Sequence, residues 1–160
     1  MKETYQQMKA RHQQEFAALP LFYAFSTQQF DEALSKRGLD RETMPAGAVT
    51  RLSAGGFCLT SDKDYILRTT ERMAAEISAE LEDYDFAYGA FLYEMDNHEY
   101  FINYQGAWDV LSCFGLNDSI SEYREENGPL EYMRDMGLKP STQRAYFDAA
   151  AEHFRRFEEM

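Results

Sequence analysis

His98 is the residue whose neighbours offer the most chemistry, because Glu94, Asp96 and Glu99 lie within four positions of it. An imidazole beside carboxylates can bind a divalent metal or act with one of them as an acid/base pair. The spacing is not His-Glu-x-x-His, and no second histidine lies nearby in the sequence. The pattern therefore favours a polar turn in which His98 bonds the backbone, with metal binding, catalysis or partner contact as the other roles.

The cysteines, serines and glycines give no case for a nucleophile or a phosphate site. Cys58 and Cys113 match no metal or redox spacing and have no basic neighbours that would lower a thiol pKa. No Gly-x-Ser-x-Gly motif is present, and no Gly-Lys-Ser/Thr follows Gly55-Gly56. The sequence favours a protein that is not an enzyme and carries no metal or cofactor.

Negative charge is concentrated in one third of the chain. Between Met73 and Tyr123 there are eleven Asp or Glu residues and no Lys or Arg, whereas the whole chain has 28 acids, 16 bases and a net charge of -12. The same segment holds eleven of the 24 aromatic residues. A surface of this kind repels nucleic acid and anionic membranes, and it attracts basic surfaces.

The first hypothesis is an acidic, non-enzymatic inhibitor that occupies the nucleic-acid-binding site of a bacterial defence nuclease, such as a CRISPR effector or a restriction enzyme. DNA carries one charge per ~1.7 Å of its axis, and ordered carboxylates on a folded protein can imitate that array. The partner would be a basic nucleic-acid-binding protein. The carboxylates expected to contact it are Glu76, Glu80, Glu82, Asp83, Asp85, Glu94, Asp96 and Glu99.

Three alternatives stay open. The first is a small metal-dependent or acid/base enzyme that uses His98 with Glu94 and Glu99. The second is an accessory interaction protein, forming a homodimer through exposed aromatics, since tyrosine is enriched at protein interfaces. The third is that the carboxylates only keep the protein in solution.

Hydrophobic periodicity predicts the helices and strands that would position the candidate residues. Apolar residues recurring at three- and four-residue steps predict helices, and Ser26 and Ser61 are good N-caps. In the last helix the inward face is expected to hold Tyr146, Phe147, Ala150, Phe154 and Phe157. The predicted helices cover residues 2–19, 26–38, 62–83, 106–115, 118–126, 130–136 and 142–158.

Two hairpins are predicted between these helices. Residues 49–52 and 57–59 form one around Gly55-Gly56, and residues 86–95 and 98–104 form the other around Asp96-Asn97. In the second hairpin Glu94 would face Glu99 across the strands. The order of elements predicts an α+β fold, a small antiparallel sheet of hairpins packed against several helices, in a single globular domain over residues 1–160.

The termini and apolar runs predict a cytoplasmic protein. The first sixteen residues lack the apolar core of a signal peptide, and no apolar run approaches the ~20 residues that span a bilayer. Two cysteines without a disulfide pattern are typical of a reducing compartment. Neither membrane association nor direct binding of nucleic acid is expected.

Three stretches carry a resemblance to a family of short proteins of unknown function from phages, plasmids and conjugative elements of gut bacteria. They are Leu19-Pro20-Leu21-Phe22-Tyr23-Ala24-Phe25-Ser26-Thr27-Gln28-Gln29-Phe30, Gly55-Gly56-Phe57, and Phe91-Leu92-Tyr93-Glu94-Met95-Asp96-Asn97-His98-Glu99-Tyr100. The segment from Gly106 to Leu116 is similar to its later part, so the resemblance covers roughly residues 15 to 120. It supplies no catalytic residues. It implies an accessory protein of mobile DNA, a setting in which inhibitors of host defence are common.

Overall fold

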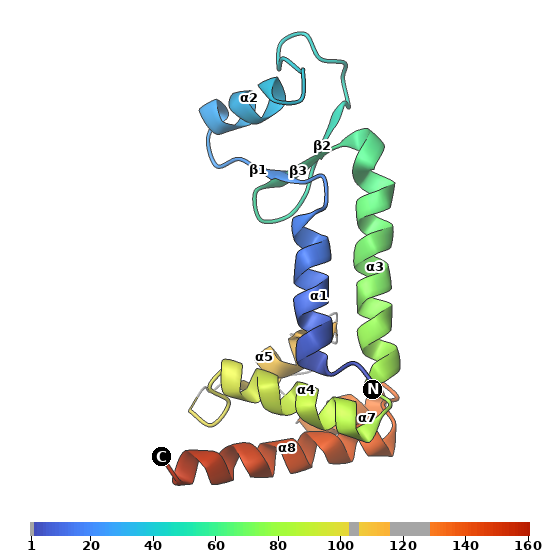
Figure 1. Cartoon of the computed structure of the whole chain (residues 1–160), viewed down its shortest axis with the longest axis vertical. Helices are drawn as coiled ribbons and strands as arrows, with labels where there is room; N and C mark the ends of the chain where they lie inside the picture. Colours follow the sequence, from blue (N-terminus) through green and yellow to red (C-terminus); the bar gives the residue numbers. More distant parts are fainter. Residues whose placement is uncertain (1, 103–105, 116–128) are drawn as a thin grey trace. The chain divides into compact units, whose positions relative to one another are not determined.

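The computed structural model describes residues 2–102, 106–115 and 129–160 (Figure 1). Within them the fold is α+β, as the sequence predicts; the expected helical piece at 118–126 lies outside the described residues. Among the described helices, none combines the length and the hydropathy of a membrane-spanning segment. The elements are α1 (Tyr5–Ala17), β1 (Phe22–Tyr23), α2 (Thr27–Ser35), β2 (Val49–Arg51), β3 (Gly56–Leu59), the 3-10 helix η1 (Thr60–Asp62), α3 (Lys63–Glu80), α4 (Tyr84–Asn97), α5 (Gly106–Ser112), α7 (Pro129–Asp135) and α8 (Pro140–Glu158).

The chain divides into two compact units. Unit 1 comprises Met1–His12 and Met73–Met160, and unit 2 comprises Gln13–Arg72. Both boundaries fall inside helices, α1 and α3, so neither shows the Pro, Gly or polar linker that reveals a boundary in a sequence. Unit 1 has twenty acidic and nine basic residues, and unit 2 has eight and seven. Nearly all of the excess negative charge therefore belongs to unit 1.

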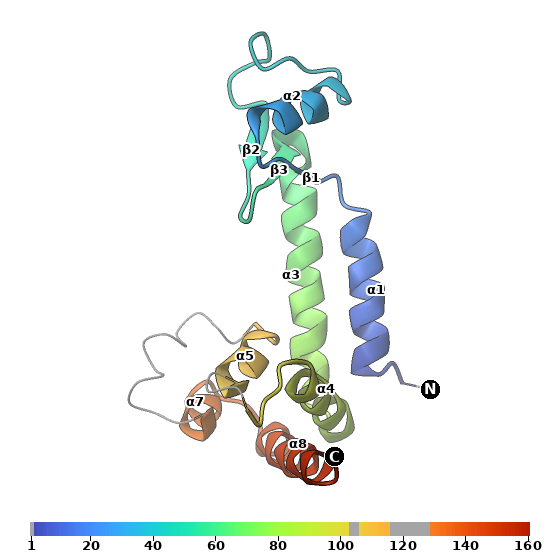
Figure 2. The same ribbon diagram turned by 90° about the vertical axis from the view of Figure 1, so that its left-hand side faces the viewer.

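Unit 2 is built on a three-stranded antiparallel sheet in the order β1-β3-β2 (Figure 2). The pairing of β2 with β3 confirms the first predicted hairpin, whose turn has Ala54 and Gly55 at φ 55° and 75°. The strand β1 was not predicted, because two residues are too short to show a period. The N-cap of α2 is confirmed, since the Ser26 side chain accepts a hydrogen bond from the backbone N–H of Gln29.

The core of unit 1 lies largely between α4 and α8, which run side by side in the same direction (Figure 1). Leu81 accepts a 2.6 Å hydrogen bond from Thr142 near the start of both helices, and Asp96 contacts His153 near their ends. Between these points the fully buried ring of Phe91 packs edge-on against Tyr146 at 5.3 Å. Burial of such large side chains supplies most of the stability of a helical unit.

The second predicted hairpin is wrong. Residues 84–97 form the helix α4, and residues 98–102 form turns, while residues 103–105 lie outside the described part of the chain. Aromatic residues gave the segment a strand-like composition, but strand propensity yields to tertiary packing. The buried side chains of α4 follow a helical period: Phe86, Ala87, Ala90, Phe91, Leu92, Glu94 and Met95. Asp83 caps the helix by accepting a 2.9 Å hydrogen bond from the N–H of Phe86.

The predicted inward face of the last helix is partly wrong. Tyr146 is buried as expected, but the fully buried neighbours are small residues, Ala145 and Ala149. The other buried positions are Thr142 and His153. Small side chains let α8 approach α4 closely, so the larger rings are turned outward. Three phenylalanines that were assigned to the core are consequently exposed: Phe147, Phe154 and Phe157.

Candidate functional site

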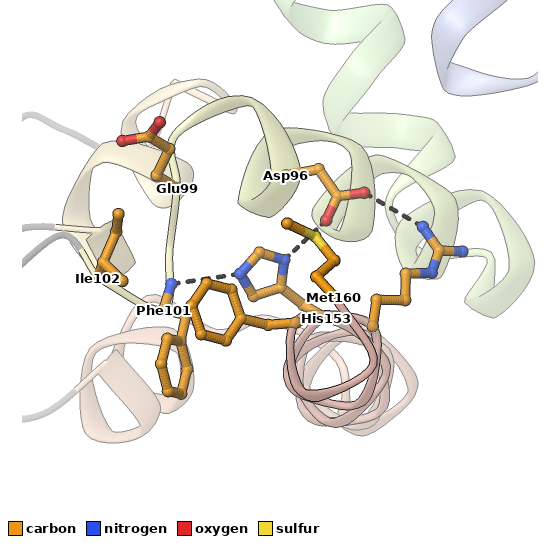
Figure 3. A pocket seen from close by; sticks show the side chains of 8 residues that line it. Asp96, Glu99, Phe101, Ile102, His153 and Met160 are labelled. Atoms are coloured by element: carbon orange, nitrogen blue, oxygen red, sulfur yellow. Dashed lines mark hydrogen bonds and ion pairs between the residues drawn. The ribbon is translucent and has the colours of Figure 1, made fainter.

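A cavity of about 440 Å³ lies in unit 1 where α4 and α8 end (Figure 3). The turn after α4 forms one wall and the last turns of α8 form the other. The lining residues are Asp96, Glu99, Phe101, Ile102, His153, Arg156, Phe157 and Met160. Apolar side chains make up much of this surface, and charged groups stand among them.

His153 joins the two walls of the cavity. Its Nδ1 contacts the Asp96 carboxylate at 2.7 Å, and its Nε2 accepts a 3.2 Å hydrogen bond from the backbone N–H of Phe101 (Figure 3). Because Nε2 accepts, the neutral ring carries its proton on Nδ1 and donates it to Asp96. Both ring nitrogens are thus in use, and His153 holds the turn after α4 against α8.

Two phenylalanine rings, Phe101 and Phe157, line the cavity, and Phe154 packs against Phe101. Phe101 stacks on Phe157 with ring centroids 4.3 Å apart and meets Phe154 edge-on at 4.8 Å. Phe101 is nevertheless 43% exposed, and the neighbouring Ile102 is 64% exposed. Scattered exposed apolar residues are ordinary, but a contiguous group around a cavity indicates a binding surface.

The charged groups of the cavity come from both of its walls. Arg156 contacts Asp96 at 3.2 Å and is also bound by Glu152. Glu99 lies at the edge of the cavity (Figure 3) and has a backbone φ of 50°, in the left-handed region. This conformation closes α4, because Tyr100 N–H can then reach the carbonyl of Met95 at 3.0 Å.

The eight predicted carboxylates fall into three groups. Five lie on the surface from α3 to the start of α4, Asp96 and Glu99 line the cavity, and Glu94 is buried. Glu76 and Glu82 are exposed or half-buried and pair with bases from distant parts of the chain. Arg11 and His12 contact Glu76 at 2.7 and 2.8 Å, and Lys139 contacts Glu82 at 2.8 Å. The base-free segment of the sequence is therefore partly neutralised by folding, which reduces the field that these carboxylates offer a partner.

The carboxylates of Glu80 and Asp83, near the start of α4, are also paired with a base of the same chain. Lys2 contacts both Glu80 and Asp83, at 3.4 and 3.3 Å. The pKa of Asp83 lies below its ordinary value because the N–H of Phe86 and then Lys2 stabilise the carboxylate. Asp85 is exposed in the first turn of α4 and has no ion pair among the described residues. Asp96 and Glu99 belong to the cavity described above.

Glu94 differs from the other seven carboxylates because its side chain is completely buried. Its Oε1 accepts a 2.6 Å hydrogen bond from the hydroxyl of Tyr5 and a further bond from the ammonium of Lys9. Burial alone would raise the pKa of Glu94, but the bonds from Lys9 and Tyr5 outweigh it and hold the pKa below its ordinary value. Glu94 is unavailable to a protein partner.

The second oxygen of Glu94 faces His98 and Cys113. His98 follows α4 directly, one turn after Glu94, and its Nε2 lies 3.4 Å from Glu94 Oε2. Cys113, just after α5, brings its Sγ within 3.5 Å of the same oxygen. Burial and then the charge of Glu94 raise the pKa of Cys113 to about 12. The carboxylate, the imidazole and the thiol form a group that offers three metal-ligand atoms.

The predicted pairing of His98 with Glu94 is thus present, whereas Glu99 is not part of the group and lines the cavity. Cys113 was missed because it is fifteen positions from His98 in the sequence. The spacing of Glu94 and His98 is a usable signal only once the segment is read as a helix, since residues four apart share a face. No comparable local signal points to Tyr5 or Lys9.

The fold and the cavity define an α+β protein with an acidic, aromatic-rich unit. The model of a family of unknown function (DUF7659) matches residues 4–125, and because this is more than half of the chain, the protein belongs to that family. No curated protein and no solved structure matches the chain. The family match ends before α8, so the wall of the cavity formed by His153, Arg156 and Phe157 lies outside the matched residues.

Proposed function

We propose that the protein is a non-enzymatic binding protein whose cavity at the ends of α4 and α8 receives an apolar side chain from a basic protein. The observation that carries the proposal is the cavity itself: an exposed aromatic group, with Asp96 and Glu99 at its edge, in the unit that holds the excess negative charge. An apolar anchor surrounded by complementary charge is the usual composition of a protein interface.

The partner chemistry follows from this surface. Phe101, Phe157 and Ile102 would contact an aliphatic or aromatic side chain. The carboxylate of Glu99 would meet a flanking Lys or Arg residue, since Asp96 is already paired with Arg156 and His153. The ion pairs of Glu76, Glu80, Glu82 and Asp83 with bases of the same chain disfavour a long uniform array of charge. They favour a local contact at the cavity.

Positively charged surfaces that also carry exposed aromatic side chains are found on proteins that bind single-stranded nucleic acid. We therefore retain the prediction that the target is a bacterial defence nuclease, inhibited by occupation of its nucleic-acid site in the cytoplasm of the host. The resemblance to proteins of phages and mobile elements supports this setting. The proposed contact with the nuclease combines an apolar part with an acidic part, and only the acidic part would imitate DNA.

The test compares variants with matched controls. Phe101→Asp should abolish capture of the partner from a bacterial lysate at about 0.1 M salt and reduce its affinity at least ~10-fold, as expected for an interface anchor. Phe16→Asp in unit 2 is the control, because Phe16 is 42% exposed against 43% for Phe101. Equal capture by the two variants would show that the cavity is not the binding surface.

A second pair of variants tests the charge. Glu99→Gln with Glu158→Gln, which removes a second charge at the last residue of α8, should weaken binding and reduce its salt dependence. Glu32→Gln with Glu42→Gln changes the net charge equally but in unit 2, so it should leave binding intact. If a captured partner is displaced by duplex DNA, it is bound at its nucleic-acid site; if it is not, occlusion of that site is wrong although the interaction stands.

A further inference from the structure

We propose that Glu94, His98 and Cys113 together bind a zinc ion. The inference goes beyond the binding role of the cavity and does not rest on it, because none of the three residues lines the cavity. It rests on the distances among the three ligand atoms, on the groups that orient Glu94, and on the chemistry of the set.

The ligand atoms form a nearly equilateral triangle. Cys113 Sγ lies 3.3 Å from His98 Nε2, His98 Nε2 lies 3.4 Å from Glu94 Oε2, and Glu94 Oε2 lies 3.5 Å from Cys113 Sγ. Usual zinc bonds to sulfur, nitrogen and oxygen at tetrahedral angles place the ligand atoms about 3.3 to 3.6 Å apart. A zinc ion can therefore be placed at bonding distance from all three with little movement of the side chains.

The backbone explains why the triangle forms. Glu94 and His98 are one helical turn apart at the end of α4, so their side chains leave the same face of the helix. Cys113 follows α5, and its thiol also lies 3.3 Å from the carbonyl of Asp109, one turn earlier. Two rigid segments thus supply the three ligands, which limits the entropy that metal binding would cost.

The surroundings of Glu94 resemble the outer shell of a metal site. Tyr5 and Lys9 both donate to Oε1, and this leaves Oε2 directed at His98 and Cys113. Metal-bound carboxylates are usually oriented in this way by hydrogen bonds to the oxygen that does not face the metal. Asn97 also approaches Oε2, at 3.3 Å, and that bond would lengthen on metal binding.

The donor set selects the metal. A thiolate with an imidazole suits zinc and excludes calcium and magnesium, which prefer all-oxygen sites. The alternative is that the three groups are only hydrogen-bonded to one another. In that arrangement the thiol of Cys113 and a proton on His98 Nε2 supply the contacts with Glu94 Oε2, and the protein takes up no metal, which is the result that the titrations below distinguish.

Cobalt and zinc titrations of the full-length protein, freed of metal with a chelator, test the proposal. We expect one Co²⁺ per chain, with a thiolate-to-cobalt charge-transfer band that Zn²⁺ abolishes. Cys113→Ser should remove the band and weaken zinc binding at least ~10-fold, and His98→Gln should weaken it similarly. Cys58→Ser is the matched control, because Cys58 is the other cysteine and is buried in unit 2.

Absence of a thiolate band in the unaltered protein would overturn the proposal, as would equal zinc affinity in the Cys113→Ser variant. Circular dichroism shows whether each variant is folded. If Cys113→Ser does not fold, the cobalt spectrum of the Cys58→Ser protein tests the proposal, because Cys113 is the sole cysteine of that variant. A thiolate band in this spectrum assigns the metal to Cys113, and its absence shows that Cys113 does not bind the metal.

Discussion

The hydroxyl of Tyr5 donates a 2.6 Å hydrogen bond to the buried carboxylate of Glu94, which lies 89 positions later in the chain. This contact fastens α1 to α4 inside unit 1 and fixes the direction of the Glu94 side chain. It also explains how an ionised carboxylate can be completely buried, since Lys9 supplies the opposite charge to the same oxygen.

Tyr5→Phe should destabilise the protein by about 1.5 to 3 kcal/mol, the usual range for a hydrogen bond to a charged group. It should also weaken zinc binding about tenfold, because Glu94 loses an orienting donor. Chemical denaturation and zinc titration measure the two effects. Tyr93→Phe is the control, because Tyr93 packs on Tyr5 but its hydroxyl makes no hydrogen bond among the described residues.

Asp83 should be required as the N-cap of α4. Asp83→Ala is expected to lower the unfolding free energy measurably, whereas Asp83→Asn keeps a capping oxygen and should lower it much less. Urea denaturation of both variants measures the two changes in unfolding free energy. Asp85→Ala, which removes an exposed acid from the first turn without removing a cap, should lower stability only slightly.

Phe91 and Phe147 test which aromatic rings belong to the core of unit 1. Phe91→Ala should destabilise by about 3 to 5 kcal/mol, because the ring is fully buried against Phe114 and Tyr146. Phe147→Ala, at a position 44% exposed, should cost much less. Similar losses in thermal or urea unfolding would contradict the observed face of α8.

Glu152 should give the protein an acid-sensitive contribution to stability. Hydrogen bonds from Arg155 and then Arg156 lower its pKa from 4.5 to about 2. A lowered pKa in the folded state stabilises the protein above pH 4.5, and this contribution is lost as the pH falls toward 2.

Glu152→Gln should therefore be less stable than the parent near neutral pH, with the difference shrinking in acid. Denaturation curves across this range measure it. Glu158→Gln removes the same charge from the same helix without breaking an ion pair among the described residues, so it is the control. A constant difference between Glu152→Gln and the parent at every pH would contradict the assignment.

Glu99 should be replaceable by glycine but not by valine. Its φ of 50° is strained for a residue with a side chain, and a β-branched residue is strained most. We expect Glu99→Gly to preserve or raise stability by about 0.5 kcal/mol and Glu99→Val to lower it by about 1 kcal/mol or more. Thermal unfolding of the two variants distinguishes these results.

The sequence by itself determined those features that depend on a few neighbouring residues. Ser26 caps α2, and the predicted hairpin forms, with its turn at Ala54-Gly55 and Gly56 as the first residue of β3. Tyr5, Met8 and His12, at three- and four-residue steps, form the buried face of α1, although Phe16 on the same spacing is 42% exposed. The concentration of negative charge could also be determined from the sequence, because counting charged residues requires no knowledge of their contacts.

Only the tertiary structure decided the identity of α4 and the outward face of α8. The aromatic residues of 86–95 suit a strand in isolation, and packing against α8, with Phe91 on Tyr146, makes them a helix. Tertiary structure also set the ion pairs of the acidic segment and brought Cys113 to Glu94 and His98. These contacts join residues fifteen to eighty-five positions apart, and no local propensity or period reports which distant side chains a folded core brings together.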